Sequence, residues 1–333
     1  MMSNNNGLDL NSDGEVGQLT TPQKGVTPKK VRPAQINGGF LNINKPAGMT
    51  SMDVIRIVRR LTGQRKVGHG GTLDPDATGV LPICIGRATR FIDRFVQGRK
   101  VYEATATFGT STDTYDASGR VTAESDASTI TREAIETALP AFTGEIKQIP
   151  PMYSAIKVKG VRLYKLAREG KEIEREPRDV VVHGLDITSW ESPTLGLRIE
   201  CGSGFYARSV IHDLGLALGN TAHMATLIRS QVGQFTLDEA VTLEELEQAT
   251  EIGDWQQLLH PIDAALLDLP AVVVDPVQEE AIGFGKSIQP GVGAISGAES
   301  QVRAYNRDGE LIALMNYDPI LGQLNPVRVL TTS

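Results

Sequence analysis

The chain has 333 residues, enough for two domains with a sizeable core, and a net charge of −7. It contains no apolar run long enough to span a bilayer, and its start lacks the order of a secretion signal, so we expect a cytoplasmic protein without membrane association. Its two cysteines, Cys84 and Cys201, lie in apolar segments, and no CxxC or HxxxH spacing occurs. The sequence therefore predicts neither a disulfide nor a metal site.

Charge is strongly segregated along the chain. Residues 53–100 contain ten Lys and Arg against four Asp, whereas residues 230–285 contain twelve Asp and Glu and no Lys or Arg. A basic face would orient a polyanion and could contact phosphates. For the acidic half, a solvated surface is the simpler interpretation.

Residues 1–35 are polar and poor in apolar side chains, which predicts a disordered tail. The ordered part is predicted to begin with a strand over residues 39–45, in which apolar and polar residues alternate and which Pro46 ends. Thr50 and Asp53 then form a capping-box pattern, and a helix is predicted behind them because apolar residues recur at helical spacing.

Residues 68–79 hold four glycines, one histidine and two carboxylates, a composition typical of an active-site loop. Glycine allows close approach of the backbone to another molecule, and Pro75 restrains Asp74 to an extended conformation. The apolar run from Val80 to Gly86 predicts a buried strand that holds the loop. For a lone Asp-Pro pair an ordinary turn would be the better interpretation; the whole twelve-residue string favours a site.

Further along, residues 101–109 alternate as a strand and lead into an Asp- and Gly-rich turn at 113–119. A basic amphipathic helix is predicted from Arg162 to Glu169. Arg208 lies where a strand end passes into a helix. His212 and Asp213, within that helix, are adjacent and point apart, which favours structural roles over an acid–base pair.

The last part of the chain changes character near Asp268. A helix capped by Thr242 precedes this junction, and short alternating strands follow over residues 272–330, with a hairpin signal at 306–309. Strands and helices do not alternate regularly, which argues against a doubly wound parallel sheet and favours an α+β fold.

The loop at 68–79 resembles the signature loop of the TruB-type tRNA pseudouridine synthases, including its Thr-Leu-Asp-Pro run at 72–75. The resemblance extends from about residue 40 to 233. The chain departs from the usual pattern at Gly70, where the family more often has Thr, and at Asn44, where many members have Asp. The family usually has two arginines after the leucine that corresponds to Leu227, whereas this chain has Ile228 and then Arg229. The other similar segments follow in the family's order: 44–51, 101–109, 149–157, 204–215 and 227–233.

The resemblance implies a mixed, mainly antiparallel sheet flanked by helices, followed by a small β-rich module similar to a PUA domain. It implies a catalytic domain over 36–268, with an RNA-contacting insertion at 147–178, and an RNA-binding accessory module over 269–333. The implied reaction converts uridine 55 in the T-arm loop of tRNA to pseudouridine without a cofactor. We expect a monomer whose partner is tRNA, with no obligate protein partner.

The resemblance also implies roles for individual residues. Asp74 corresponds to the essential catalytic aspartate, Arg208 to the arginine that pairs with it, and Tyr102 to a tyrosine that packs on the base and is a candidate for proton transfer. A guanidinium in that place would keep a carboxylate ionised beside an aromatic base. Lys45 could reach a phosphate or the wall of the site. The predicted substrate-binding residues are Lys45, His69, Met152, Tyr153, Tyr206 and Leu227.

Two other functions fit some of the same residues. A non-catalytic RNA-folding protein would use the basic surface without needing the carboxylate of Asp74. A metal-assisted hydrolase would use His69, Asp74 and Asp76, but the two carboxylates would lie on opposite sides of an extended segment, and no second histidine is close in sequence.

Overall fold

A computed structural model of the chain describes residues 37–154, 156–158, 160–289 and 301–330. The disordered tail predicted for residues 1–35 lies outside this range. The described residues belong to one compact unit, so the predicted boundary at residue 268 stays a prediction.

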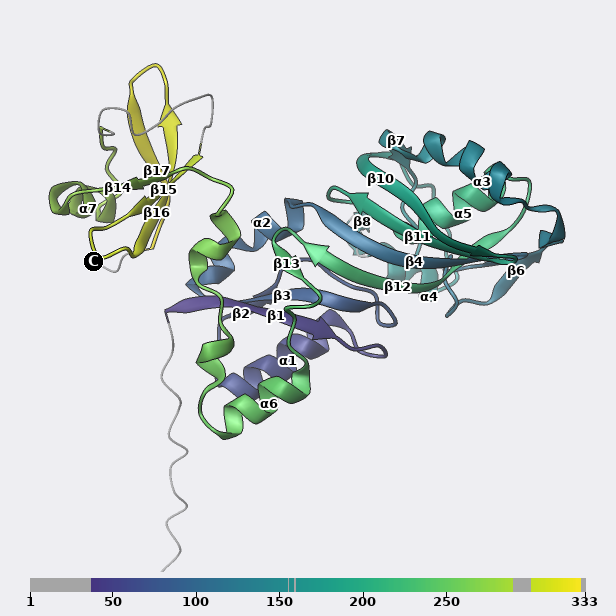
Figure 1. Ribbon diagram of the computed structural model, residues 1–333, viewed down its shortest axis with the longest axis horizontal. Helices are drawn as coiled ribbons and strands as arrows, with labels where there is room; N and C mark the ends of the chain where they lie inside the picture. Colours follow the sequence, from purple (N-terminus) through teal and green to yellow (C-terminus); the bar gives the residue numbers. More distant parts are fainter. Residues whose placement is uncertain (1–36, 155, 159, 290–300, 331–333) are drawn as a thin grey trace, which may run out of the picture. The chain divides into compact units, whose positions relative to one another are not determined.

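A nine-stranded sheet forms the centre of the fold (Figure 1). Within it every strand pair is antiparallel except β3 with β12, which confirms the predicted mixed, mainly antiparallel α+β architecture. In spatial order the main strands are β1 (Gly38–Lys45), β3 (Thr78–Gly86), β12 (Ala222–Val232), β4 (Lys100–Phe108), β11 (Thr194–Cys201), β10 (Arg178–Glu191) and β7 (Gly144–Gln148). The short strands β2 (Val67–His69) and β13 (Phe235–Thr236) pair with β3 and β12.

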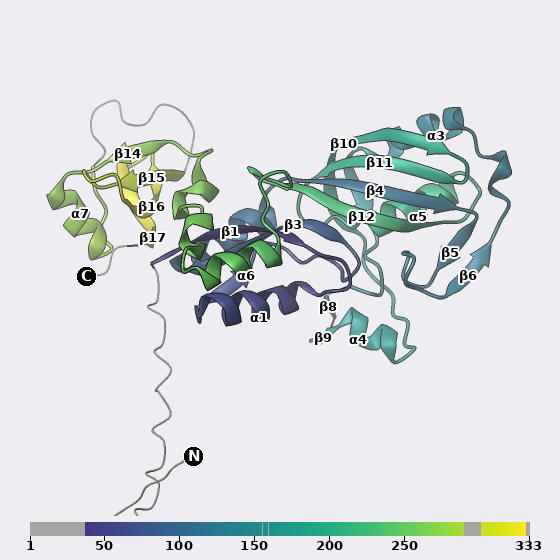
Figure 2. The same cartoon turned by 60° about the horizontal axis from the view of Figure 1, so that its bottom comes forward.

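Helices cover the sheet (Figure 2). Helix α1 (Ser51–Thr62) begins at the predicted capping box of Thr50 and Asp53 and ends at Gly63 in the left-handed conformation. Helix α6 (Leu243–Glu251) contacts α1 and β1, and helix α5 (Ala207–Ala217) packs against β12. The remaining helices of this part are α2 (Ile92–Gln97), α3 (Arg132–Ala138) and α4 (Leu163–Arg168), with single 3-10 turns at Arg87–Phe91, Ala127–Thr129, Leu139–Phe142, Trp255–Leu258 and Ile262–Leu266.

Two hairpins project from the sheet. Strands β5 (Thr110–Thr112) and β6 (Val121–Glu124) enclose the turn at 113–120, and β8 (Lys157–Val158) with β9 (Val161–Arg162) precedes α4. The first hairpin follows directly from β4, as the strand-then-turn pattern in the sequence predicts.

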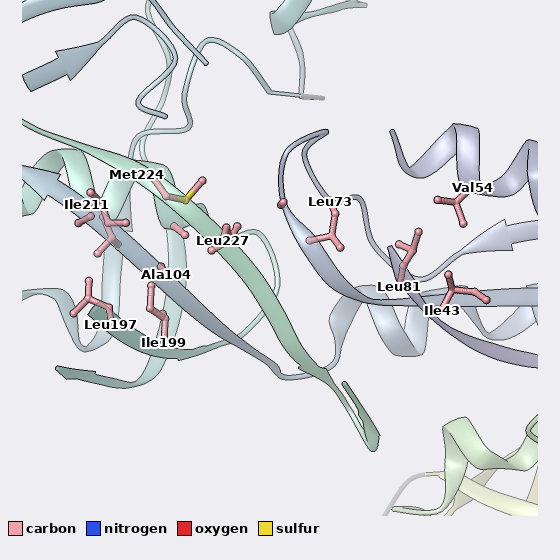
Figure 3. Packing of buried hydrophobic residues seen from close by; sticks show 14 of the residues in the cluster. Ile43, Val54, Leu73, Leu81, Ala104, Leu197, Ile199, Ile211, Met224 and Leu227 are labelled. Carbon is pink, nitrogen blue, oxygen red and sulfur yellow. The ribbon is translucent and has the colours of Figure 1, made fainter. Parts of the chain in front are cut away.

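One hydrophobic cluster joins the sheet to its helices, and the loop between β2 and β3 takes part in it through Leu73. Figure 3 shows Leu73 between Leu227 of β12 and the group formed by Ile43, Val54 and Leu81. Leu73 immediately precedes Asp74, so burial of this leucine fixes the backbone at the start of the Asp-Pro pair. Both cysteines are buried in strands with free thiols, as the sequence predicts.

A second, four-stranded sheet follows residue 270, with its own buried cluster. Its strands are β14 (Ala271–Val273), β15 (Gln301–Tyr305), β16 (Leu311–Asp318) and β17 (Gln323–Val329), accompanied by helix α7 (Pro276–Gly283). The predicted hairpin at 306–309 is confirmed as the turn between β15 and β16. In the described part of the chain, no helix has the length and apolar character needed to cross a membrane.

Candidate active site

The loop that carries Asp74 is held by a side chain of α1 and by the backbone of β3. Ser51, at the start of α1, uses its Oγ to accept from the Leu73 amide at 2.9 Å and to donate to the Leu73 carbonyl at 3.1 Å. The Gly70 amide donates to the carbonyl of Pro82 at 2.8 Å. These bonds satisfy loop backbone groups that would otherwise be buried without partners.

Lys45, the last residue of β1, is 0% exposed. Its Nζ donates to the carbonyl oxygens of Pro46, Met49 and Pro75 at 2.8, 2.7 and 2.8 Å, which uses all three of its protons. Burial lowers the pKa of Lys45 to about 8, although Asp76 and Asp74 oppose this shift. Of the two contacts considered for Lys45, a phosphate or the site wall, this geometry corresponds to the wall: the side chain fixes the residue after Asp74 and presents no free donor to RNA.

Arg229 on β12 is 1% exposed and was not among the predicted site residues. It donates through Nε to the carbonyl of Val80 at 2.8 Å and through Nη2 to the carbonyl of Gly71 at 3.1 Å. It also lies opposite Tyr102 in the β4–β12 register. A signal existed in the sequence, since Arg229 follows Leu227 by two positions and an alternating strand places both on one face.

Arg208, the second residue of α5, is the centre of the site and is 4% exposed. Its Nη2 lies 3.0 Å from Oδ2 of Asp74 and donates to the Tyr153 carbonyl at 2.9 Å. Its Nη1 donates to the Thr114 carbonyl at 3.0 Å and lies 3.2 Å from Oδ2 of Asp116. The guanidinium therefore bridges two carboxylates and two carbonyls.

Asp116 was not predicted as a site residue, although its turn stood out by composition. One carboxylate oxygen faces Arg208, and the other accepts from Thr114 Oγ1 at 2.7 Å and from the amide and hydroxyl of Ser118 at 3.0 and 2.6 Å. Such a fully bonded carboxylate is a fixed counter-charge for the arginine.

The carboxyl of Asp74 is 39% exposed at its side chain, so a substrate can reach it. Burial raises the pKa of Asp74 above its ordinary value; Arg208 and Lys45 oppose this shift, while Asp116 and Asp76 add to it. The expected stabilisation of the ionised form by Arg208 is present, but the net shift is upward because desolvation is the largest effect.

Two tyrosines lie within the electrostatic reach of Asp74. Burial raises the pKa of Tyr102, on β4, and the pKa of Tyr206, at the start of α5. The backbone of Tyr206 is held from both sides by Gln148, which accepts from its amide at 2.8 Å and donates to its carbonyl at 2.9 Å. Both phenols are therefore neutral near pH 7 and offer aromatic surface to a base.

The other predicted residues take different places. Leu227 and Met152 are buried apolar residues, and Tyr153 contributes its backbone carbonyl to Arg208. His69 ends β2, and burial and the nearby charge of Arg229 lower its pKa. The structure thus gathers Asp74, Tyr102, Tyr206 and Arg208, and the charged neighbour of His69 is Arg229, which also faces Tyr102.

Gly70, one of the departures from the family pattern, has a packing explanation. A Cβ built on Gly70 would lie 2.4 Å from Cβ of Phe95, so the phenylalanine occupies the space of a side chain. Phe95 stacks on Phe235 at a centroid distance of 5.3 Å. In this chain a larger residue at position 70 would displace that aromatic pair.

Most basic residues of the segment at 53–100 have an acceptor within the protein, although Arg56, Arg60 and Arg99 pair at the surface and stay 71%, 64% and 56% exposed at their side chains. Eight of its ten Lys and Arg donate to acceptors within the protein because those acceptors lie next to them in the folded chain. They are Arg56, Arg59, Arg60, Arg87, Arg90, Arg94, Arg99 and Lys100. The predicted phosphate contacts of this segment therefore stay a prediction.

No group of three or more His, Cys, Asp or Glu side chains in the described ranges could hold a metal ion. In particular, Asp74 has Arg208 as its partner rather than His69. A cationic partner at hydrogen-bonding distance competes with a metal for the same oxygen, which weakens the hydrolase alternative.

Comparisons with known proteins agree with this geometry. Residues 59–207 match the model described as TruB family pseudouridylate synthase (N terminal domain), and residues 208–267 match the tRNA pseudouridylate synthase B C-terminal domain. The chain is 45% identical over 275 residues to the tRNA pseudouridine synthase B of Dehalococcoides mccartyi, covering 81% of this chain and 92% of that protein. It is 48% identical over 239 residues to the protein of the same name from Symbiobacterium thermophilum, covering 71% and 78%.

A solved structure also shares the fold. A chain of the crystal structure of a Cbf5–Nop10–Gar1 complex superposes with a TM-score of 0.68 at 26% identity, covering 88% of this chain and 85% of that one. The two matched family models meet between Ala207 and Arg208, so they include both the loop of Asp74 and the helix that carries its arginine.

Proposed function

Because the chain belongs to the TruB family of pseudouridylate synthases, we propose that it converts uridine 55 in the T-arm loop of tRNA to pseudouridine. The observation that carries this proposal is the accessible carboxyl of Asp74, held at 3.0 Å by a buried arginine. Its relatives act on tRNA by name, and we infer the same substrate here. A tRNA substrate supports the expected cytoplasmic localisation.

The reaction is an isomerisation and needs no outside reactant. The N1–C1′ bond breaks, the base turns while it stays in the site, and a C5–C1′ bond forms; C5 releases its proton and N1 takes one up, so the composition is unchanged. Asp74 is the essential carboxylate, and three roles suit its position: attack at C1′, addition to the base, or removal of the 2′ proton. Tyr102 and Tyr206 supply aromatic surface for the base, with Tyr102 the candidate for proton transfer.

The target base must leave its stack to reach Asp74, at a cost of roughly a few kcal/mol. We propose that the insertion at 147–178 offsets part of this cost by binding the RNA backbone. It exposes Arg162, at the end of β9, and Lys165 and Arg168 on helix α4. The guanidiniums of Arg162 and Arg168 lie 6.0 and 5.6 Å from the centre of the Tyr164 ring. The module over 269–333 would add an accessory RNA contact to a monomeric enzyme.

The test is tritium release from C5-labelled uridine in an unmodified T-arm stem-loop, in the presence of EDTA. We expect release by the native protein and none by Asp74→Asn. Asp76→Asn is the matched control, since Asp76 is a neighbouring exposed carboxylate without a hydrogen bond to Arg208, and it should retain activity. Tight stem-loop binding without release by the native protein would leave the RNA-folding function instead.

A further inference from the structure

Tyr115 is the only non-glycine residue with a positive φ, 63°, among the residues that the structure describes. A tyrosine in this left-handed conformation is disfavoured because its Cβ crowds the backbone, so something in the fold must hold it there. Its ring stacks on the imidazole of His212, with centroids 3.9 Å apart and planes inclined by 9°. Neither ring belongs to the site described above.

The positions of the two partners connect this stack to the catalytic arginine. His212 follows Arg208 by four residues on α5, so both side chains lie on one face of the helix. Tyr115 lies between Thr114 and Asp116, the two residues that accept from Arg208 Nη1. The helix thus holds one turn at two points, by the guanidinium at 208 and by the ring at 212.

The backbone of the turn is held on its other side by β12. The Tyr115 carbonyl accepts from the Met224 amide at 3.0 Å, and the Ala117 amide donates to the Met224 carbonyl at 3.0 Å. The imidazole is itself oriented, with Nδ1 3.3 Å from Oγ of Ser111. With both ends of the turn anchored, the conformation at Tyr115 sets how the Thr114 carbonyl and the Asp116 carboxylate face Arg208.

We propose that Tyr115 and His212 form a positioning pair for the reaction. Their stack stabilises the left-handed turn that presents Thr114 and Asp116 to Arg208, and Arg208 in turn orients the carboxyl of Asp74. This inference rests on the proposed function and adds two residues that act on the rate through the arginine, without contact with the substrate.

The test compares single-turnover tritium release at saturating stem-loop, stem-loop affinity and melting temperature. Tyr115→Ala should lower the rate constant by about tenfold or more, because small displacements of catalytic groups are costly, while affinity stays within about twofold. Tyr115→Phe, which keeps the stack, should have a rate constant close to that of the native protein. Trp190→Leu, which removes an aromatic pair with Phe108 elsewhere on the sheet, is the control for a general loss of stability and should lower the melting temperature without a comparable loss of rate.

Two further variants make the result decisive. Tyr115→Gly adopts the left-handed backbone without strain but lacks the ring, so we expect it to fold and still be slow. In an Asp116→Asn background, Tyr115→Ala should lower the rate constant by a much smaller factor than it does in the native protein, because both changes act through Arg208. Full activity of Tyr115→Gly, or fully additive losses in the double variant, would overturn the proposal. Absence of release by the native protein would instead be a failure of the proposed function.

Discussion

In the proposed reaction Arg208 is the residue on which the site depends most, because its planar guanidinium reaches Asp74 and Asp116 with two different nitrogens. A lysine carries the same charge but cannot bridge two carboxylates in one plane. Its compact ammonium would also leave one or both of the buried carbonyls of Thr114 and Tyr153 without a donor.

We therefore expect Arg208→Lys to lower the single-turnover rate by roughly a hundredfold with little change in tRNA affinity. The control is Arg198→Lys, on β11, where the arginine is exposed and pairs loosely with Asp186 and Glu200. Rates and dissociation constants measured on the same stem-loop decide the matter, and a near-native rate for Arg208→Lys would contradict the assigned role.

The raised pKa of Asp74 makes a prediction about pH. A carboxyl with a raised pKa holds its proton to higher pH, so activity that needs the ionised form is complete above that pKa and is lost as the pH falls through it. The acid limb of the single-turnover rate should thus have its midpoint above the ordinary carboxyl value of 3.8. Burial raises the pKa of both tyrosines above 10.0, so no alkaline limb from them should occur near neutral pH. A rate that stays constant down to about pH 4 would refute this assignment.

At the scale of elements, the parallel pairing of β3 with β12 decides the geometry of the loop that carries Asp74. Gly79 lies opposite Arg229 in this pairing, has a φ of +99°, and a Cβ built on it would lie 2.3 Å from the Arg229 carbonyl oxygen. The glycine therefore allows β12 to approach the end of the loop and to bring Arg229 beneath Gly71.

Replacement of Gly79 by alanine should destabilise the protein by about 3 kcal/mol or more and abolish activity, since backbone overlap adds to the strain at positive φ. Gly253→Ala is the matched control, because its φ is +84° but no atom lies within 4 Å of the added Cβ. We expect Gly253→Ala to lower the free energy of unfolding by about 1 kcal/mol. Equal losses of unfolding free energy in chemical denaturation would show that strain alone, and not the approach of β12, is responsible.

At the scale of the whole molecule, the surplus of negative charge is compatible with an RNA substrate only if a local basic surface binds it. Most basic residues at 53–100 have an acceptor within the protein, whereas Arg162, just before α4, and Lys165 and Arg168 on α4 are exposed. The insertion is thus the stronger candidate for phosphate contacts.

Reversal of two of these charges, Lys165→Glu with Arg168→Glu, should weaken tRNA binding by about tenfold or more and reduce its dependence on salt concentration. Arg60→Glu, which removes a surface pair with Glu247, should have a smaller effect. Binding isotherms at several salt concentrations provide the comparison. A larger loss from Arg60→Glu would return the phosphate-binding role to the basic segment.

The amino-acid sequence by itself was sufficient for the features that depend on near neighbours in the chain. The capping box of Thr50 and Asp53, the strand after the glycine-rich loop and the hairpin at 306–309 all follow from local propensity and turn chemistry. The family resemblance then pointed to Asp74 and Arg208, which the fold brings within 3.0 Å.

Only the tertiary structure decided which buried groups support that pair. Asp116 and Arg208 are 92 residues apart in sequence, and Arg229 and Gly71 are 158 apart, so their contacts depend on strand order and register rather than on any local pattern. The same holds for the bond from Lys45 to the Pro75 carbonyl, and for Arg94 and Arg99, whose acceptors Asp268 and Glu200 come from distant segments. The sequence does not distinguish a charged side chain that faces solvent from one that donates to a buried carbonyl. The packing of the surrounding segments decides which of the two environments it has.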